Sequence, residues 1–148
     1  DVWDFLREEG PSGRFDRIAL FDVLEHFPHA DGLRLLAELR RLLRPGGRIL
    51  IKVPNAASPW GAQFQHGDLT HRAAYTPLSL RQLSIAAGYR WLGARPHLMG
   101  SPARRILDRV LHAVLDRMLM SPPELWSANF FGIIERETGE RETGERGE

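Results

Sequence analysis

The stretch from Phe15 to Asn55 places the strongest constraint on the fold. It reads FDRIALFDVLEHFPHADGLRLLAELRRLLRPGGRILIKVPN. A short apolar run at 18–21 predicts a strand, leucines at three- and four-residue steps predict a helix over 31–43, and a Pro-Gly-Gly turn at 45–47 ends that helix before a second apolar run at 49–53. Strand, helix, turn and strand of these lengths predict a βαβ unit, in which the two strands are parallel and the crossover is right-handed.

The rest of the chain adds a second helix, a long loop and a third helix. A helix near 77–87 follows the N-cap residue Thr76, and Gly88 ends it. The loop at 56–74 is long for a compact domain, and loops of this length usually have a function or are disordered. Residues 103–120 repeat apolar side chains at helical spacing, and such a stripe is usually part of a core. A lid or a membrane-surface helix is the alternative for this segment.

The composition is that of a soluble globular protein with enough chain for one core. The chain has 148 residues, of which 43% are hydrophobic and 26% charged. The absence of cysteine excludes disulfides and thiolate metal sites. The net charge is +1, and because 135–148 holds six glutamates and three arginines, the remainder carries about +4. That charge is too small and too dispersed to indicate a nucleic-acid partner.

Both ends of the sequence lead to expectations. The start, Asp1-Val2-Trp3-Asp4, lacks the basic and apolar regions of a signal peptide, and no apolar run reaches the roughly 20 residues of a transmembrane helix, so a cytoplasmic protein is expected. The start also lacks an initiator methionine, and we expect the N-terminus to lie inside a longer protein. Residues 137–148 repeat Glu-Thr-Gly-Glu-Arg without an apolar residue, and disorder is expected there.

Three short motifs carry a resemblance to a known family. They are Phe15-Asp16-Arg17-Ile18, then an acidic residue followed by Glu25-His26, and then Leu43-Arg44-Pro45-Gly46-Gly47. In this order and at this spacing they resemble the middle of a class I S-adenosylmethionine-dependent methyltransferase. The stretch Gly67 to Arg72, followed by Tyr75-Thr76-Pro77, also resembles the segment that lines the substrate pocket in that family.

The resemblance implies the fold. It covers roughly residues 1–135 and only the second half of the family domain, so we expect an α/β protein with the C-terminal half of a Rossmann-like, doubly wound sheet. The strands near 17–21, 48–53, 89–94 and 129–135 would form one mostly parallel sheet whose last strand is antiparallel. Residues 1–136 would be a partial methyltransferase domain. The glycine-rich cofactor loop of the first half has no counterpart in this sequence, so the missing N-terminal half of the domain is an expected partner.

The resemblance also implies the chemistry. The cofactor would be S-adenosylmethionine, held in this chain by Phe21, Asp22 and Val23. The methyl acceptor would be an oxygen or nitrogen of a small molecule. Such an acceptor loses a proton, and histidine is the side chain suited to accept it near neutral pH, so His26 and His71 are the candidate catalytic residues. His66 ranks third, and the remaining three histidines are interpreted as surface or helix-face residues, namely His29, His97 and His112.

Alternatives stay open both for the site and for the whole chain. Asp22, Glu25, His26 and His71 are similar to the ligand set with which ubiquinone-pathway O-methyltransferases and small-RNA 2′-O-methyltransferases bind a divalent metal, although aspartate stands here where those groups have glutamate. Alternatively, Glu25 and His26 simply face solvent. At the level of the whole chain, the alternatives are an inactive methyltransferase remnant or an interaction module, and half of another doubly wound protein such as a dehydrogenase. The EH pair and the LRPGG turn argue against the dehydrogenase.

Overall fold

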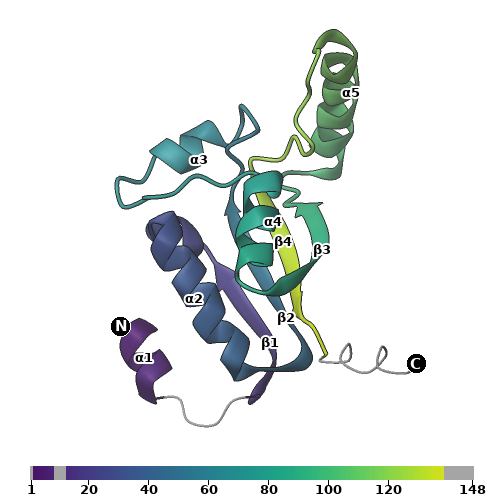
Figure 1. Cartoon of the computed structure of the whole chain (residues 1–148). Coiled ribbons are helices and arrows are strands. Elements are labelled where there is room, and N and C mark those ends of the chain that lie inside the picture. Colours follow the sequence, from purple (N-terminus) through teal and green to yellow (C-terminus); the bar gives the residue numbers. More distant parts are fainter. Residues whose placement is uncertain (1, 9–12, 139–148) are drawn as a thin grey trace, which may run out of the picture.

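A four-stranded sheet organises the computed structural model, which describes residues 2–8 and 13–138. The strands are β1 (Phe15–Phe21), β2 (Leu43–Pro54), β3 (Tyr89–Pro96) and β4 (Asn129–Arg136), in the spatial order β1-β2-β4-β3 (Figure 1). β1 and β2 are parallel, and β4 runs antiparallel to both of its neighbours. The predicted α/β class, the four strands and the antiparallel last strand are therefore confirmed.

Five helices and one 3₁₀ turn connect the strands within the described residues. They are α1 (Val2–Glu8), η1 (Leu24–His26), α2 (His29–Leu42), α3 (Ala62–His66), α4 (Pro77–Ala86) and α5 (Pro102–Met118). The predicted helices lie within two residues of the observed ones at most ends. Helix α3 was not predicted, because it is a single short turn within the loop at 56–74.

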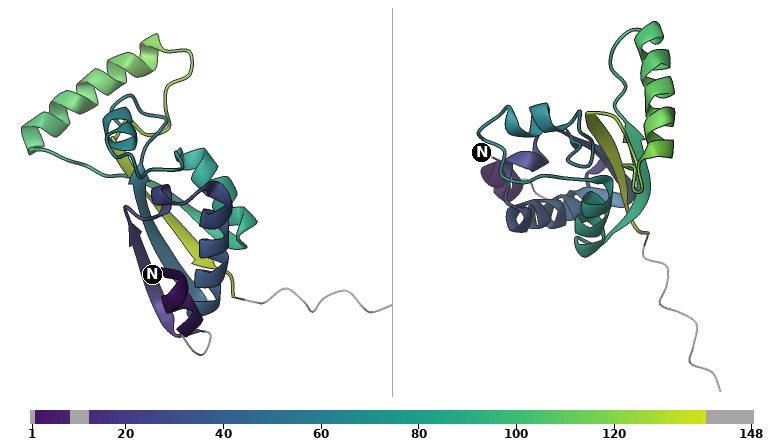
Figure 2. Two further views of the ribbon diagram at one scale, coloured as in Figure 1. Left: turned by 90° about the vertical axis from the view of Figure 1, so that its left-hand side faces the viewer. Right: turned by 90° about the horizontal axis from the view of Figure 1, so that it is seen from above.

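The core lies on one face of the sheet. In β2 the side chains of Ile49, Ile51 and Val53 are buried against α2 and α4, whereas the intervening Leu50 and Lys52 are only partly buried. The views in Figures 1 and 2 agree that both helices lie on the same side. In β1 the residues at 16, 17, 19 and 21 remain exposed, so the other face of the sheet is only partly covered at this strand.

Two details of the predicted βαβ unit need correction. The first long helix was predicted over 31–43, but α2 begins two residues earlier, at His29 after Pro28, and Asp31 lies in its first turn. The Pro-Gly-Gly turn follows the helix rather than ending it. Helix α2 stops at Leu42, and the next residue already pairs with Phe15, so the turn lies within the first part of β2. Gly46 has a φ of +74°, the left-handed conformation that favours glycine.

Specific hydrogen bonds fix the ends of the helices that cover the sheet. The side chain of Thr76 accepts a bond from the backbone N–H of Ser79, and the Ser79 hydroxyl accepts one in return, which confirms Thr76 as the N-cap of α4. At the C-terminal end of α2, Arg136 from β4 donates to the carbonyl oxygens of Arg40 (3.0 Å) and Leu43 (2.5 Å). The final residue of β4 thus caps α2.

Helix α5 stands apart from the rest of the molecule. Figure 2 shows it projecting beyond the sheet, at the end where β1 and β2 finish. None of its residues is buried. The expectation that the apolar stripe at 103–120 forms part of the core is therefore wrong. No helix among the described residues is long and apolar enough to cross a membrane.

Candidate functional site

The turn after β1 holds the residues predicted to contact the cofactor. Phe21 is half exposed, and its ring packs edge-to-face on Phe131 with 5.9 Å between the centroids. Asp22 has a φ of +53°, an uncommon conformation for a residue with a side chain, and Val23 is partly buried. The carboxylate of Asp22 lies 2.5 Å from Nζ of Lys52, so an ion pair holds this turn against the end of β2. Ligands of open α/β sheets bind at this end of the strands.

Glu25 lies one turn further along the chain and is buried. Only 1% of the residue is exposed, and neither carboxylate oxygen has a hydrogen-bond partner. Its backbone carbonyl accepts bonds from the N–H groups of Arg72 (2.8 Å) and Ala73 (3.0 Å), which attach the loop at 56–74 to η1. Burial, reinforced by the charge of Asp22, raises the pKa of the Glu25 carboxyl above its ordinary value.

His71 presents one ring nitrogen to two carboxylates. Its Nδ1 lies 3.0 Å from the carbonyl oxygen of Gln65, and because a carbonyl can only accept, Nδ1 carries the proton. In the neutral ring Nε2 then has the lone pair. That nitrogen lies 4.0 Å from Glu25 Oε1 and 3.9 Å from Asp68 Oδ2. Bonds from the hydroxyl and amide of Thr70 lower the pKa of Asp68, so this carboxylate stays ionised beside the ring.

His26 contacts His71 directly. The two rings meet edge-to-face with 4.8 Å between their centroids. The Thr70 hydroxyl donates its single proton to Asp68 Oδ1 at 2.6 Å, and it lies 2.9 Å from Nδ1 of His26. Since that proton is already donated, Nδ1 of His26 is the donor to Thr70, and Nε2 of His26 is also left with its lone pair.

The structure therefore brings together three of the four residues predicted as metal ligands. One ligand atom from each of Glu25, His26 and His71 lies within 4.8 Å of the others. Asp22 is not part of this cluster, because its carboxylate pairs with Lys52. A buried carboxylate without a partner and two imidazole lone pairs are a donor set that fits a divalent cation such as Mn²⁺ or Zn²⁺. The same set suits a proton acceptor, with Glu25 stabilising the protonated ring.

Tyr75 adds a second buried polar group beside this cluster. The residue is fully buried, and its hydroxyl has no hydrogen-bond partner. Burial and the charge of Glu25 raise the pKa of Tyr75 to about 12. Its ring lies edge-to-face with that of His29, at 5.3 Å between centroids. The sequence had assigned Tyr75 no role of its own.

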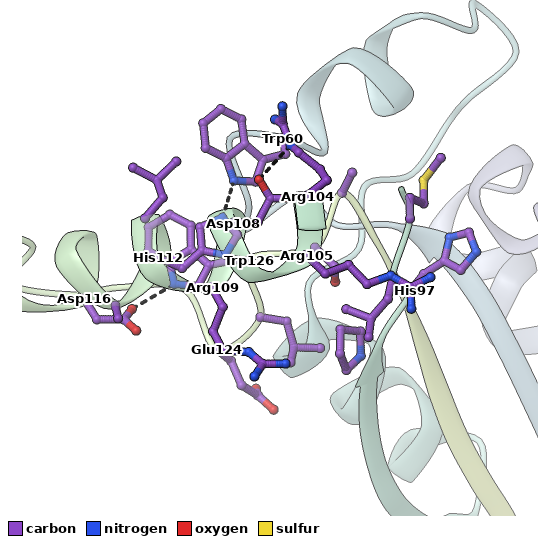
Figure 3. A pocket seen from close by; sticks show the side chains of 18 residues that line it. Trp60, His97, Arg104, Arg105, Asp108, Arg109, His112, Asp116, Glu124 and Trp126 are labelled. Atoms are coloured by element: carbon purple, nitrogen blue, oxygen red, sulfur yellow. Dashed lines mark hydrogen bonds and ion pairs between the residues drawn. The ribbon is translucent and has the colours of Figure 1, made fainter. Parts of the chain in front are cut away.

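Two hollows lie at this end of the molecule. The smaller, of about 330 Å³, is lined by His71 and by neighbours in the loop at 56–74. The larger, of about 610 Å³, lies between α5 and the segment 124–128, and its lining is drawn in Figure 3. A volume of this size is typical of small-molecule sites, which span about 300–1,000 Å³. Neither His26 nor Glu25 lines the larger cavity.

The larger cavity contains residues that the sequence had not indicated. His112 stacks on Trp126 with 4.9 Å between the rings and accepts a hydrogen bond of 3.0 Å from the indole N–H of Trp60. His97 also lines the cavity, and its ring contacts Phe131, which in turn contacts Phe21. The interpretation of His97 and His112 as surface or helix-face residues therefore missed the cavity that both line. The apolar stripe of α5 gave no signal for it, because the polar side of the helix forms the wall.

A family comparison identifies the domain. A family model described as a methyltransferase domain matches residues 2–92, which include β1, the candidate cluster and β2. The chain belongs to the class I S-adenosylmethionine-dependent methyltransferases. No curated protein sequence matches it significantly.

Solved methyltransferase structures share the fold. A SAM-dependent methyltransferase from Archaeoglobus fulgidus has a TM-score of 0.71 at 16% identity, covering 92% of this chain and 65% of its own. A 1,6-didemethyltoxoflavin-N1-methyltransferase from Burkholderia thailandensis, solved with that compound and S-adenosylhomocysteine, has a TM-score of 0.55 at 17% identity, covering 90% and 48%. An O-methyltransferase family protein from the same organism has a TM-score of 0.57 at 18% identity, covering 95% and 34%. The chain thus spans less than two thirds of these methyltransferase structures.

Proposed function

We propose that this chain is part of an enzyme that transfers a methyl group from S-adenosylmethionine to an oxygen or nitrogen of a small molecule. The observation that carries the proposal is the cluster of buried Glu25 with the partly buried His26 and His71 at the carboxyl end of β1, next to the turn at Phe21–Val23. The family supplies the reaction class, and the cluster supplies groups that can accept a proton from the methyl acceptor.

The roles follow from the contacts. When bound, the cofactor supplies a methyl group made electrophilic by its sulfonium, and Phe21, Asp22 and Val23 are the residues of this chain that would contact it. His71, whose Nε2 faces Glu25, is the best placed base, and His26 lies against it. Glu25 stabilises the ring that gains the proton, because a buried carboxylate favours a neighbouring positive charge. Holding the cofactor methyl group and the acceptor atom in line supplies much of the rate acceleration, since a displacement depends on orientation.

The two hollows support a small-molecule acceptor. The smaller hollow is lined by His71, so an acceptor bound there would lie beside the proposed base. The cavity beneath α5 is not lined by that base, but it offers aromatic surfaces from Trp60, Trp126 and His112, against which a flat molecule can stack. Phe131 connects this cavity to Phe21, so the acceptor and the predicted cofactor wall would be neighbours. In the bound relative from Burkholderia thailandensis the compound named is likewise a small molecule.

A divalent metal is a second reading of the same cluster. Glu25, His26 and His71 would bind it, and Asp22 would join them only by giving up Lys52. Such an ion would position acceptor hydroxyls and lower their pKa. The four-ligand metal site would require Asp22 to leave Lys52, whereas the proton-acceptor reading requires no such rearrangement, and we prefer it for that reason.

We infer that catalysis belongs to a longer protein. The sequence contains no glycine-rich cofactor loop, one edge of β1 is unpaired among the described strands, and the second face of the sheet is only partly covered. A further part of the same domain would supply all three. Residues 1–136 would then be the partial domain, whereas the predicted disordered tail at 137–148 lies almost wholly outside the described residues. The cytoplasmic location remains a prediction, and the isolated chain is expected to be inactive.

An inactive remnant or an interaction module is the competing proposal. The first test is therefore made on the longer protein, comparing wild type with His26→Ala and His71→Ala. Both variants are expected to lower kcat at least 100-fold while changing cofactor affinity less than threefold, because general bases act in the transition state. Gln63→Ala, at an exposed position of α3 in the same loop, is the control. Unchanged turnover in both variants would remove these residues from the mechanism, and absence of any turnover in wild type would favour the remnant.

A further inference from the structure

Helix α5 presents its apolar face away from the rest of its own chain. Side chains three and four residues apart share one face of a helix. The outward row is between 51% and 74% exposed, and it consists of Ile106, Leu107, Val110, Val114 and Met118. Leu98 and Met99 before the helix, and Leu119 and Met120 after it, are exposed as well. Monomeric proteins rarely leave so large a continuous apolar surface in water.

Polar contacts on the inward face hold the helix in this orientation. Asp108, His112 and Leu115 form the partly buried row. His112 stacks on Trp126 and accepts a bond from Trp60, and the indole N–H of Trp126 donates to Asp116 at 2.8 Å (Figure 3). The outward direction of the apolar row is therefore set by several side-chain contacts on the opposite face.

No other segment among residues 2–8 and 13–138 covers this face. Helix α5 follows β3, which lies at the far edge of the sheet from β1. A further segment of the domain that pairs with β1 would lie at the opposite edge. The terminal repeat at 137–148 contains no apolar residue and cannot bury an apolar surface.

The charge of the segment favours an anionic surface. Between Arg95 and Met118 there are five arginines and two aspartates, a net charge of +3, whereas the whole chain carries +1. A second copy would place the same positive charge against it, which disfavours pairing. An anionic bilayer attracts such a segment, and arginines on the polar side of a helix can reach lipid head groups.

The chemistry of the outward row also favours lipid over protein. All five side chains of the row are aliphatic or methionine, and none can form a strong hydrogen bond. Protein interfaces usually contain one hydrogen bond per 100–200 Å² or so, and their cores are enriched in aromatic residues. The acyl boundary of a bilayer requires neither. We propose that α5 is a membrane-surface helix, which lies in the plane of an anionic bilayer with this row buried among the acyl chains.

The proposal is tested with the complete 148-residue chain and vesicles of phosphatidylcholine, with or without phosphatidylglycerol. The wild type is expected to sediment with vesicles that contain phosphatidylglycerol, and rising salt should weaken the binding. Val110→Asp is expected to lower the partition coefficient at least tenfold, because it places a charge in the centre of the outward row, which the bilayer would bury. Ile85→Asp is the matched control, since Ile85 is similarly exposed but lies on α4, and it should bind like wild type.

Three results would overturn the proposal. The first is that the wild-type protein does not bind vesicles containing phosphatidylglycerol. The second is equal vesicle binding by wild type and Val110→Asp, and the third is an equal loss of vesicle binding in Val110→Asp and Ile85→Asp. A dimer by light scattering that Val110→Asp converts to monomer, with no vesicle binding, would instead assign the face to a contact between copies. Circular dichroism checks folding, and Met118→Asp, near the end of the helix, is read in place of Val110→Asp if that variant is unfolded.

Discussion

At the scale of single residues, Glu25 is the most unusual group in the chain. A buried carboxyl group without a hydrogen bond costs about 1–3 kcal/mol, and proteins usually avoid one. Here the cost falls at the end of a parallel strand, next to two imidazoles with free lone pairs. Buried polar groups that lower the stability of the fold and lack a hydrogen-bond partner are typical of binding and catalytic sites.

Replacing Glu25 tests that cost. Burial raises the pKa of Glu25 above its ordinary 4.5, so the folded chain holds this proton more tightly than the unfolded chain does. The stability that this proton contributes is fully present below about pH 4.5, and it is lost as the pH rises through the folded pKa. The side chain of Glu25→Gln stays neutral at every pH. Its free energy of unfolding should therefore be about 1–2 kcal/mol higher than that of wild type at pH 8 and equal to it near pH 4. Urea unfolding at the two pH values measures the difference.

Glu38→Gln, which replaces a partly exposed carboxyl paired with Arg41, is the control and should show no such crossover. A Glu25→Gln variant that is less stable than wild type at pH 8 would contradict the prediction. Repeating the unfolding with EDTA and then with Zn²⁺ separates the two readings of the cluster. Stabilisation of wild type by Zn²⁺ that Glu25→Gln and His71→Ala both lose would favour the metal.

Parts of the site were predictable from the sequence because they lie in short motifs. Glu25 and His26 follow β1 immediately, and a strand that ends at the binding edge places them there. His71, 45 positions after His26, was reached through its resemblance to a family segment, and the backbone bonds from the loop to Glu25 explain how it arrives. His112 was missed, since a helix pattern gives the direction of a side chain relative to its helix and not to the rest of the molecule.

At the scale of elements, the same limit explains the error over α5. Its apolar spacing predicted a helix correctly, and its period also defined an apolar face. Contacts distant in sequence, here those of Trp60 and Trp126, decide which face of the helix turns toward the rest of the protein. By contrast, α4 and the strands were predictable because capping residues and apolar runs act locally.

Two N-cap substitutions should separate these helices. Thr76→Ala is expected to lower the free energy of unfolding by about 1 kcal/mol, because α4 covers the sheet and unfolds with it. Ser101→Ala removes the equivalent bond to the N–H of Arg104, but α5 buries no residue, so global unfolding should change by less than about 0.3 kcal/mol. Its effect should appear as faster amide exchange within 102–118. Equal losses of global stability would show that α5 unfolds together with the sheet.

At the scale of the whole molecule, the sheet has an unpaired edge. β1 pairs with β2 and with no other described strand, and its far side leaves backbone groups available to another chain. We therefore expect the 148-residue chain to self-associate. We also expect it to bind S-adenosylhomocysteine more weakly than millimolar, because only the turn at 21–23 remains to contact the cofactor.

Light scattering and calorimetric titration check these expectations. Ala19→Lys, at an exposed position of β1, should reduce self-association, whereas Leu78→Lys, at an exposed position of α4, should not. Micromolar binding of S-adenosylhomocysteine by a monomer would show that the cofactor site is more complete than the residues here indicate.

The contacts beneath α5 give the molecule a built-in optical reporter. Of its four tryptophans, Trp60 and Trp126 both contact side chains of this helix, whereas Trp3 belongs to α1 and Trp91 to β3. If α5 swings outward, both indoles lose their partners to water and their emission moves to longer wavelength. A chain with phenylalanine at positions 3 and 91 would therefore report, through its fluorescence alone, whether the helix remains docked.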